Sequence, residues 1–224
     1  MIAKLIAEFR FFMSMPHNMR VLLITNMLYA LVLPVVEIFM AAYIMRYFAD
    51  TSYVAIFQVA MYTGIIITSL TNGFLLKSFK VAHLYSFGIL LSGMSMAGMM
   101  FVQNITLFGL IISGTLIGAA SGFFWTNRYL MALNTTRDEN RNYFFGLESF
   151  FFTISNITIP LVIGALLASI DGMQIFGIVF SIYTGYRIVT IIVFAITILA
   201  CFSLARGKFV NPLQKDFLYF RFDR

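Results

Sequence analysis

Glu37 is the residue whose type and position most directly suggest chemistry. It lies within the first long apolar run, three residues after Pro34, where an ionised side chain costs about 2.5 to 3.5 kcal/mol on membrane-insertion scales. Asn26 lies eleven residues earlier, about three helical turns, and Tyr29 is near it. We predict that Glu37, Asn26 and Tyr29 form a polar strip that binds a solute or couples its movement to protons. The alternative is a neutral Glu37 hydrogen-bonded to a neighbouring helix.

Arg128 and Glu148 form a second candidate. They lie symmetrically about the polar loop at residues 134–142, so they occupy similar depths on two antiparallel neighbours. This placement predicts a charge pair that gates one end of the protein. The alternative is an arginine that extends to the lipid headgroups and an exposed glutamate at a helix start, where the helix dipole favours an acid.

Enzyme chemistry has little support in the sequence. Ala119, Ala120, Ser121 and Gly122 nearly match the Gly-x-Ser-Gly motif of an intramembrane protease, but that reaction needs a histidine base on a later span. The two histidines, His17 and His83, both precede the motif, and Cys201 is the single cysteine. We therefore predict no catalytic residue, no metal site and no cofactor.

The elements that position these residues follow from composition. The chain has 224 residues, of which 61% are hydrophobic and 11% charged, whereas soluble proteins carry about a quarter charged residues. In the strands of a membrane barrel, apolar and polar residues alternate. The apolar runs of this chain show no such alternation. At about 20 residues per span, they predict an all-α membrane protein with six transmembrane helices. The predicted spans are Val21–Ile44, Tyr53–Leu76, Leu84–Val102, Ile105–Met131, Phe144–Ile170 and Tyr186–Leu204. The connection at residues 171–185 is the least regular and could partly continue a helix.

The distribution of basic residues predicts the orientation of the helices. Lysine and arginine accumulate in short cytoplasmic loops, and in this layout all of the 15 basic residues except Arg46 and Arg187 fall on one side. Both termini are therefore expected in the cytoplasm, with the bundle in the plasma membrane, or in the inner membrane of a bacterium. The net charge of +6 then reflects topology, and we predict no nucleic-acid partner.

Three segments are expected along the chain. Residues 1–19 read as an amphipathic segment on the membrane surface, with Pro16 near its end. Residues 20–206 form the six-helix bundle. Residues 207–224 form a basic and aromatic cytoplasmic tail.

Small residues and a proline suggest how the spans pack. Gly114, Gly118 and Gly122 recur every four residues in the fourth span, which predicts a close helix contact. Pro160 interrupts the fifth span, with Gly164 one turn later. This pair is a predicted hinge, or alternatively a tolerated kink.

Several of these motifs resemble those of one family. The loop at residues 134–141 leads basic residues into Phe145 and Gly146, and Pro160 with Gly164 keeps part of a Gly-Pro-x-x-Gly-Gly pattern. The loop at residues 73–80 keeps a glycine and basic character, although Lys77 stands where an acid is usual. In this order of features the chain resembles the N-terminal half of a major facilitator superfamily transporter, and residues 211–213 resemble the start of the linker between its halves.

The resemblance implies a fold and a function. Each half of such a transporter has six helices in two three-helix inverted repeats, and alternating access moves one half against the other. The chain is then expected to be a half-transporter or an N-terminal portion that moves an unidentified small solute, with proton coupling through Glu37. Its second half would come from the same gene product, another chain or a homodimer. The alternative is a membrane scaffold or assembly subunit that transports nothing.

Overall fold

The computed structural model describes residues 10–102, 104–175 and 178–210. Six helical segments in this part of the chain are long and apolar enough to cross a membrane, which confirms the predicted all-α membrane fold. The first segment is made of α2 (His17–Pro34), a π-helical turn η1 (Val35–Phe39) and α3 (Met40–Phe48). The others are α4 (Thr51–Leu75), α5 (Val81–Phe101), α6 (Leu107–Thr135), α7 (Asp138–Ile170) and α8 (Ile182–Ala205).

Local residues set the helix ends, and most helices extend beyond the apolar runs. Asp50 caps α4 by accepting a hydrogen bond from the Ser52 backbone N–H at 2.8 Å, and Thr106 caps α6 through the Gly109 N–H at 3.1 Å. At the start of α7 the side chain of Asn140 accepts from the backbone N–H of Arg137 at 2.8 Å. These polar first turns explain why α7 begins six residues before the predicted span.

The connection between α7 and α8 is a short hairpin and does not continue a helix. Strands β1 (Gln174–Ile175) and β2 (Ile178–Val179) pair antiparallel. Gly172 has a positive φ of 78°, which a glycine adopts readily, and the chain turns there. The Asp171 carboxylate then accepts from the Ile182 N–H at 3.0 Å and fixes the start of α8.

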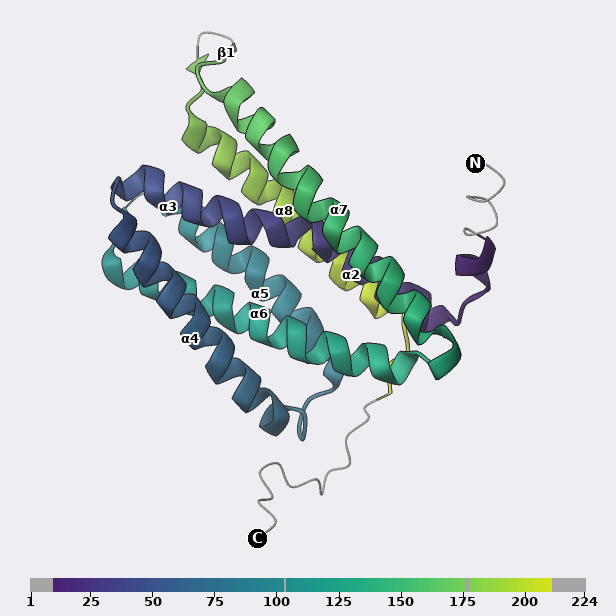
Figure 1. Ribbon diagram of the computed structural model, residues 1–224. Coiled ribbons are helices and arrows are strands. Elements are labelled where there is room, and N and C mark those ends of the chain that lie inside the picture. Colours follow the sequence, from purple (N-terminus) through teal and green to yellow (C-terminus); the bar gives the residue numbers. More distant parts are fainter. Residues whose placement is uncertain (1–9, 103, 176–177, 211–224) are drawn as a thin grey trace.

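The helices are arranged around a central pair. Figure 1 shows α4 and α7 at opposite edges of the bundle, with α2–α3 and α6 between them. In the closest pairings α4 and α5 pack on α6, α7 and α8 pack on α2, and α5 packs on α8. This set of pairings is symmetric. If α2–α3, α4 and α5 are exchanged with α6, α7 and α8 in that order, the same pairs result. These pairings fit the two three-helix repeats that the family resemblance implies.

The first span contains an irregular turn at Pro34. Proline lacks a backbone N–H and crowds the preceding turn of a helix, and η1 follows it directly. Such π-helical insertions occur frequently at functional sites. Glu37 lies in the middle of this turn.

The predicted end segments are only partly described. Residues 10–14 are helical and Pro16 precedes the start of α2, so residues 17–19 belong to the first span. Residues 1–9 and 211–224, which carry the rest of the amphipathic segment and of the tail, lie outside the described part of the chain.

Candidate functional site

Four buried polar side chains from four helices meet inside the bundle. Arg128 on α6 donates from Nε to Oε1 of Glu148 on α7 at 2.8 Å, and from Nη2 to Oε2. The amide nitrogen of Asn26 on α2 donates to the same Glu148 Oε1. The hydroxyl of Tyr85 on α5 donates to Asn26 Oδ1. The result is a continuous chain of hydrogen bonds, which we call the polar network.

The polar network is shielded from its surroundings. Relative exposure is 0% for Asn26 and Tyr85, 1% for Glu148 and 6% for Arg128. At 1.5 Å per helical residue, Asn26, Arg128 and Glu148 lie about 10 to 15 Å from the helix ends where α2 and α7 begin and α6 ends. In the predicted orientation that end faces the cytoplasm. The network thus lies about two to three helical turns inside the bundle from that end.

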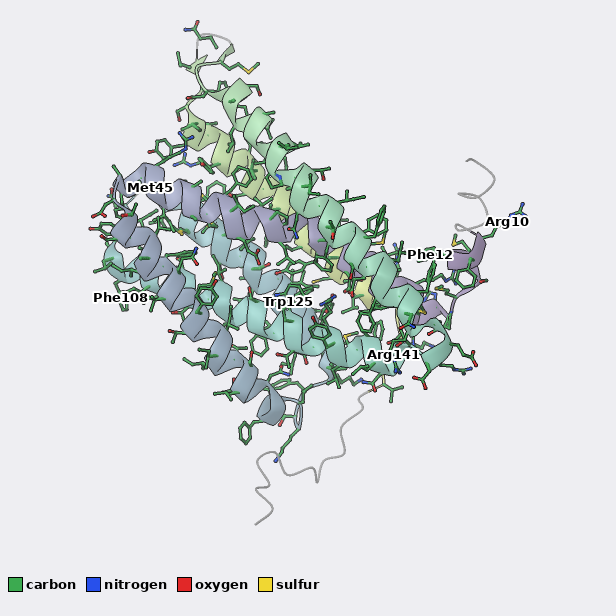
Figure 2. All side chains as sticks on the ribbon, in the orientation of Figure 1. Arg10, Phe12, Met45, Phe108, Trp125 and Arg141 are labelled. Carbon is green, nitrogen blue, oxygen red and sulfur yellow. The ribbon has the colours of Figure 1, made fainter. Side chains whose placement is uncertain are left out.

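Three aromatic rings surround the guanidinium of Arg128. Its Cζ lies 4.8 Å from the ring centroid of Trp125, 4.7 Å from that of Tyr129 and 5.1 Å from that of Phe152. Figure 2 shows Trp125 on the side of α6 that faces α7, in agreement with its 5.8 Å centroid distance to Phe152 on α7. Cation–π contacts of this kind contribute about 0.5 to 2 kcal/mol each. They partly offset the desolvation of the arginine.

The structure places Asn26 and Glu37 apart, with Tyr29 close enough to Glu37 to interact with it electrostatically. Asn26 belongs to the polar network, whereas Tyr29 is 1% exposed and packs against Phe124 at a centroid distance of 4.3 Å. Glu37 lies about 16 Å from Asn26 along the helix axis, at 1.5 Å per residue, and is exposed at the bundle surface. Within the described part of the chain its carboxylate makes no hydrogen bond or ion pair.

The glycines of the fourth span lie against α4. A side-chain carbon built on Gly114 would stand 2.8 Å from the Phe57 carbonyl oxygen, and one on Gly122 would stand 2.9 Å from the Thr68 Cβ. At Gly118 it would overlap the Met61 backbone. The two helices therefore approach with almost no side chain between them along this stripe.

A second polar contact joins the same two helices. The amide of Asn127 on α6 donates to Asn72 Oδ1 on α4 at 2.8 Å, and Asn72 donates back to Asn127 Oδ1 at 3.2 Å. Both residues are buried. A reciprocal amide pair satisfies each partner without a net charge, so α4 and α6 are held together by both packing and hydrogen bonds.

The predicted hinge lies in a long uninterrupted helix. Pro160 is within α7, which continues to Ile170. Gly164 has no atom within 4 Å of the position that a side-chain carbon would take. The surroundings of this part of α7 are therefore open.

Sequence reasoning missed Tyr85, the three rings around Arg128, and the Asn72–Asn127 pair. The asparagines carried a usable signal, because amides within apolar spans need a partner as Asn26 does. The tyrosine and the rings carried none, because aromatic residues are common in membrane helices. Among the described residues, no group of three or more His, Cys, Asp or Glu side chains could hold a metal ion.

Six apolar helices around a buried ion pair define an integral membrane protein with a polar centre. The family model of the Major Facilitator Superfamily matches residues 22–216. The chain belongs to this family, which confirms the resemblance seen in its motifs, and it is a membrane transporter of the major facilitator kind. No curated protein matches the chain.

Proposed function

We propose that the chain supplies one six-helix bundle of a secondary transporter that moves a small solute by alternating access, and that the polar network is its solute site. The main support for this proposal is the buried ion pair of Arg128 and Glu148. It is linked by hydrogen bonds to Asn26 and Tyr85, so that four helices contribute. A solute that changes the bonding of any member changes the contacts among all four helices.

Stability alone gives a poor reason for such a network. A buried ion pair is often no more stabilising than apolar residues of similar volume, and ionisable groups in membrane spans commonly mark solute or proton pathways. Most other buried side chains are apolar, and the buried polar ones among the described residues, such as Asn72 and Asn127, carry no charge. A charged centre in that setting supports a role in binding.

The surface of α7 supports contact with a second bundle. At 100° per residue, Ser149, Thr153 and Asn156 fall on one face, and all three are exposed. The next face around the helix carries apolar residues, namely Phe150, Ile154 and Ile157, with exposures of 55%, 41% and 61%. The apolar face suits lipid, whereas a polar face suits a water-filled path or another helix. The second bundle would cover this polar face, and the two would rock about the path between them.

Glu37 is the proposed proton-coupling residue. Its exposed position in η1, after Pro34, leaves the carboxylate free to exchange protons with water in the path between the bundles. Loss of its charge on protonation would favour one of the two access states. Pro160 and Gly164 on α7 would allow the bending that accompanies the change.

The proposal extends to the surroundings of the bundle. The plasma membrane, or a bacterial inner membrane, is the expected location. Residues 1–19 would lie at the membrane surface and residues 207–224 would begin the cytoplasmic link to the second bundle. These assignments rest on the pattern of charges and on family membership.

Solute-dependent flux tests the proposal. The whole protein is reconstituted in vesicles that contain a pH-sensitive dye, and amino acids, sugars, organic acids and organic amines are added one at a time. We expect at least one class to change the internal pH, or to accumulate as a radiolabelled solute, above the level in empty vesicles. Equality with empty vesicles for every class, with protein correctly inserted, would contradict transport and favour the scaffold alternative.

A further inference from the structure

The guanidinium of Arg128 has a hydrogen-bonding edge that Glu148 does not use. A guanidinium carries five N–H donors in a plane and presents two edges, each able to bind an oxyanion with two hydrogen bonds. Glu148 occupies the edge formed by Nε and Nη2. The other edge is formed by Nη1 and the second hydrogen of Nη2.

This second edge is buried without an acceptor. Arg128 is 6% exposed, and its Nη1 is inaccessible and makes no hydrogen bond to any described residue. The Tyr129 side chain lies beside the guanidinium and is close enough to contribute a side-chain hydrogen bond to its charged form, but it provides no acceptor in hydrogen-bond geometry at Nη1. An unpartnered buried donor costs about 1 to 3 kcal/mol, and more on a charged group. An acceptor from outside the chain would remove that cost.

Glu148, the acidic member of the pair, has no oxygen that lacks a hydrogen-bond donor. Glu148 Oε1 accepts from both Asn26 and Arg128, and Oε2 accepts from Arg128. The aromatic rings that could hold a cationic solute already hold the arginine. The unmet capacity of the site is therefore for an acceptor, and it lies next to a fixed positive charge.

We infer that the transported solute carries a carboxylate or phosphate group, and that this group binds the free edge of Arg128, with the apolar part of the solute against the neighbouring rings. The inference rests on the proposed function and names its substrate class. Arg128 would then hold two anions at once, the Glu148 carboxylate on one edge and the solute on the other.

Access to the edge requires movement of the side chains that cover it. Arg128 is 6% exposed and its Nη1 is inaccessible, so the edge is covered in this arrangement. Tyr129, which forms part of the cover, is 51% exposed. Rotamer changes of exposed side chains take picoseconds to nanoseconds, so a turn of Tyr129 would remove part of this cover.

Trp125 provides a direct test, because it is the single tryptophan of the sequence and its ring stacks on Arg128. Its fluorescence in the purified full-length protein is titrated with four probes that share a four-carbon body: butyrate, butyl phosphate, butylammonium and butyramide. Ionic strength is held constant with sodium chloride. We expect a saturable change with butyrate or butyl phosphate, and none with butylammonium or butyramide.

Two variants identify the group that responds. In E148Q the neutral glutamine no longer competes for Arg128, so the dissociation constant for the anion should fall by on the order of tenfold, a typical coupling between sites. In R128Q/E148Q two amides can bond to each other, as Asn72 and Asn127 do. That variant should keep its thermal unfolding midpoint within roughly 8 °C of the wild type and lose the anion response.

Several results would overturn the inference. They are a saturable response to butylammonium that disappears in E148Q, an anion response that persists in R128Q/E148Q, or no response to any of the four probes. Failure of the proposed function has a different signature, which is absence of flux for every solute class in vesicles. A protein that transports a cation or a neutral solute without an anion response would therefore refute only the substrate class.

Discussion

Replacement of Glu148 by alanine should destabilise the bundle more than any other single truncation in the polar network. The change removes the carboxylate that accepts from Arg128 Nε at 2.8 Å and from Nη2. It also removes the acceptor of the Asn26 amide. Because Arg128 is 6% exposed, its charge would stay buried without a counterion, and Asn26 would keep an unsatisfied donor.

The expected magnitude follows from these lost contacts. Removal of one partner of a buried ion pair costs about 3 to 5 kcal/mol. For a chain of this size each kcal/mol lowers the unfolding midpoint by roughly 2 to 4 °C, so the E148A midpoint should fall by roughly 6 to 20 °C. R128Q/E148Q leaves no buried charge and should remain within about 2 kcal/mol of the wild type, because replacing both members of a pair is often neutral.

The assay is thermal unfolding of the purified protein in detergent, followed by Trp125 fluorescence. R128Q, E148Q and R128Q/E148Q complete a double-mutant cycle with the wild type. The two single substitutions should each destabilise the protein more than the double one, with a coupling energy of at least about 2 kcal/mol. Additive effects within about 0.5 kcal/mol, or an E148A midpoint equal to that of the wild type, would refute the buried ion pair.

Three further predictions concern the packing, the acid and the proline. G118V should lower the free energy of unfolding by about 1 to 3 kcal/mol or more, because the added carbon overlaps the α4 backbone. In the control G98A the added carbon meets no atom within 4 Å, so the unfolding midpoint should be unchanged or slightly raised. Equal midpoints for the two variants would contradict the close contact. E37Q should abolish pH-driven flux while membrane insertion persists, and an unchanged pH dependence would exclude coupling through Glu37. P160A should raise the unfolding midpoint of the protein by a few degrees and slow solute flux, since a regular helix bends less; flux at the wild-type rate would exclude a hinge.

The sequence predicts the fold well because membrane helices are specified by properties that a linear reading captures. Twenty-residue apolar runs fix the number of spans, and the glycine spacing at Gly114, Gly118 and Gly122 marks a face suited to close approach. The ends are predicted less well. Polar caps such as Asp50 and Asn140 extend helices beyond their apolar runs, and the hairpin after Gly172 depends on a backbone conformation that hydropathy does not reveal.

The site is predicted only in part, because its partners come from helices that are distant in sequence. Arg128 and Glu148 lie on the two helices that one loop connects. Their distances from that loop can be compared in the sequence, which predicts that the two side chains form a pair. Asn26 was grouped with Glu37 because both lie on the first span, yet its hydrogen bonds go to Tyr85 and Glu148. Helical periodicity assigns a residue to a face of its own helix, but not to the neighbour that covers that face.

Solute uptake by the R128Q/E148Q variant tests the central claim most directly, that the polar network is the solute site. Initial uptake rates of the solute found in the flux screen are measured in vesicles that hold equal amounts of wild-type and variant protein with similar unfolding midpoints. The account predicts that the variant loses at least about 90% of the rate, which corresponds to 1.4 kcal/mol or more of transition-state stabilisation. Uptake at the wild-type rate by a folded variant would contradict it.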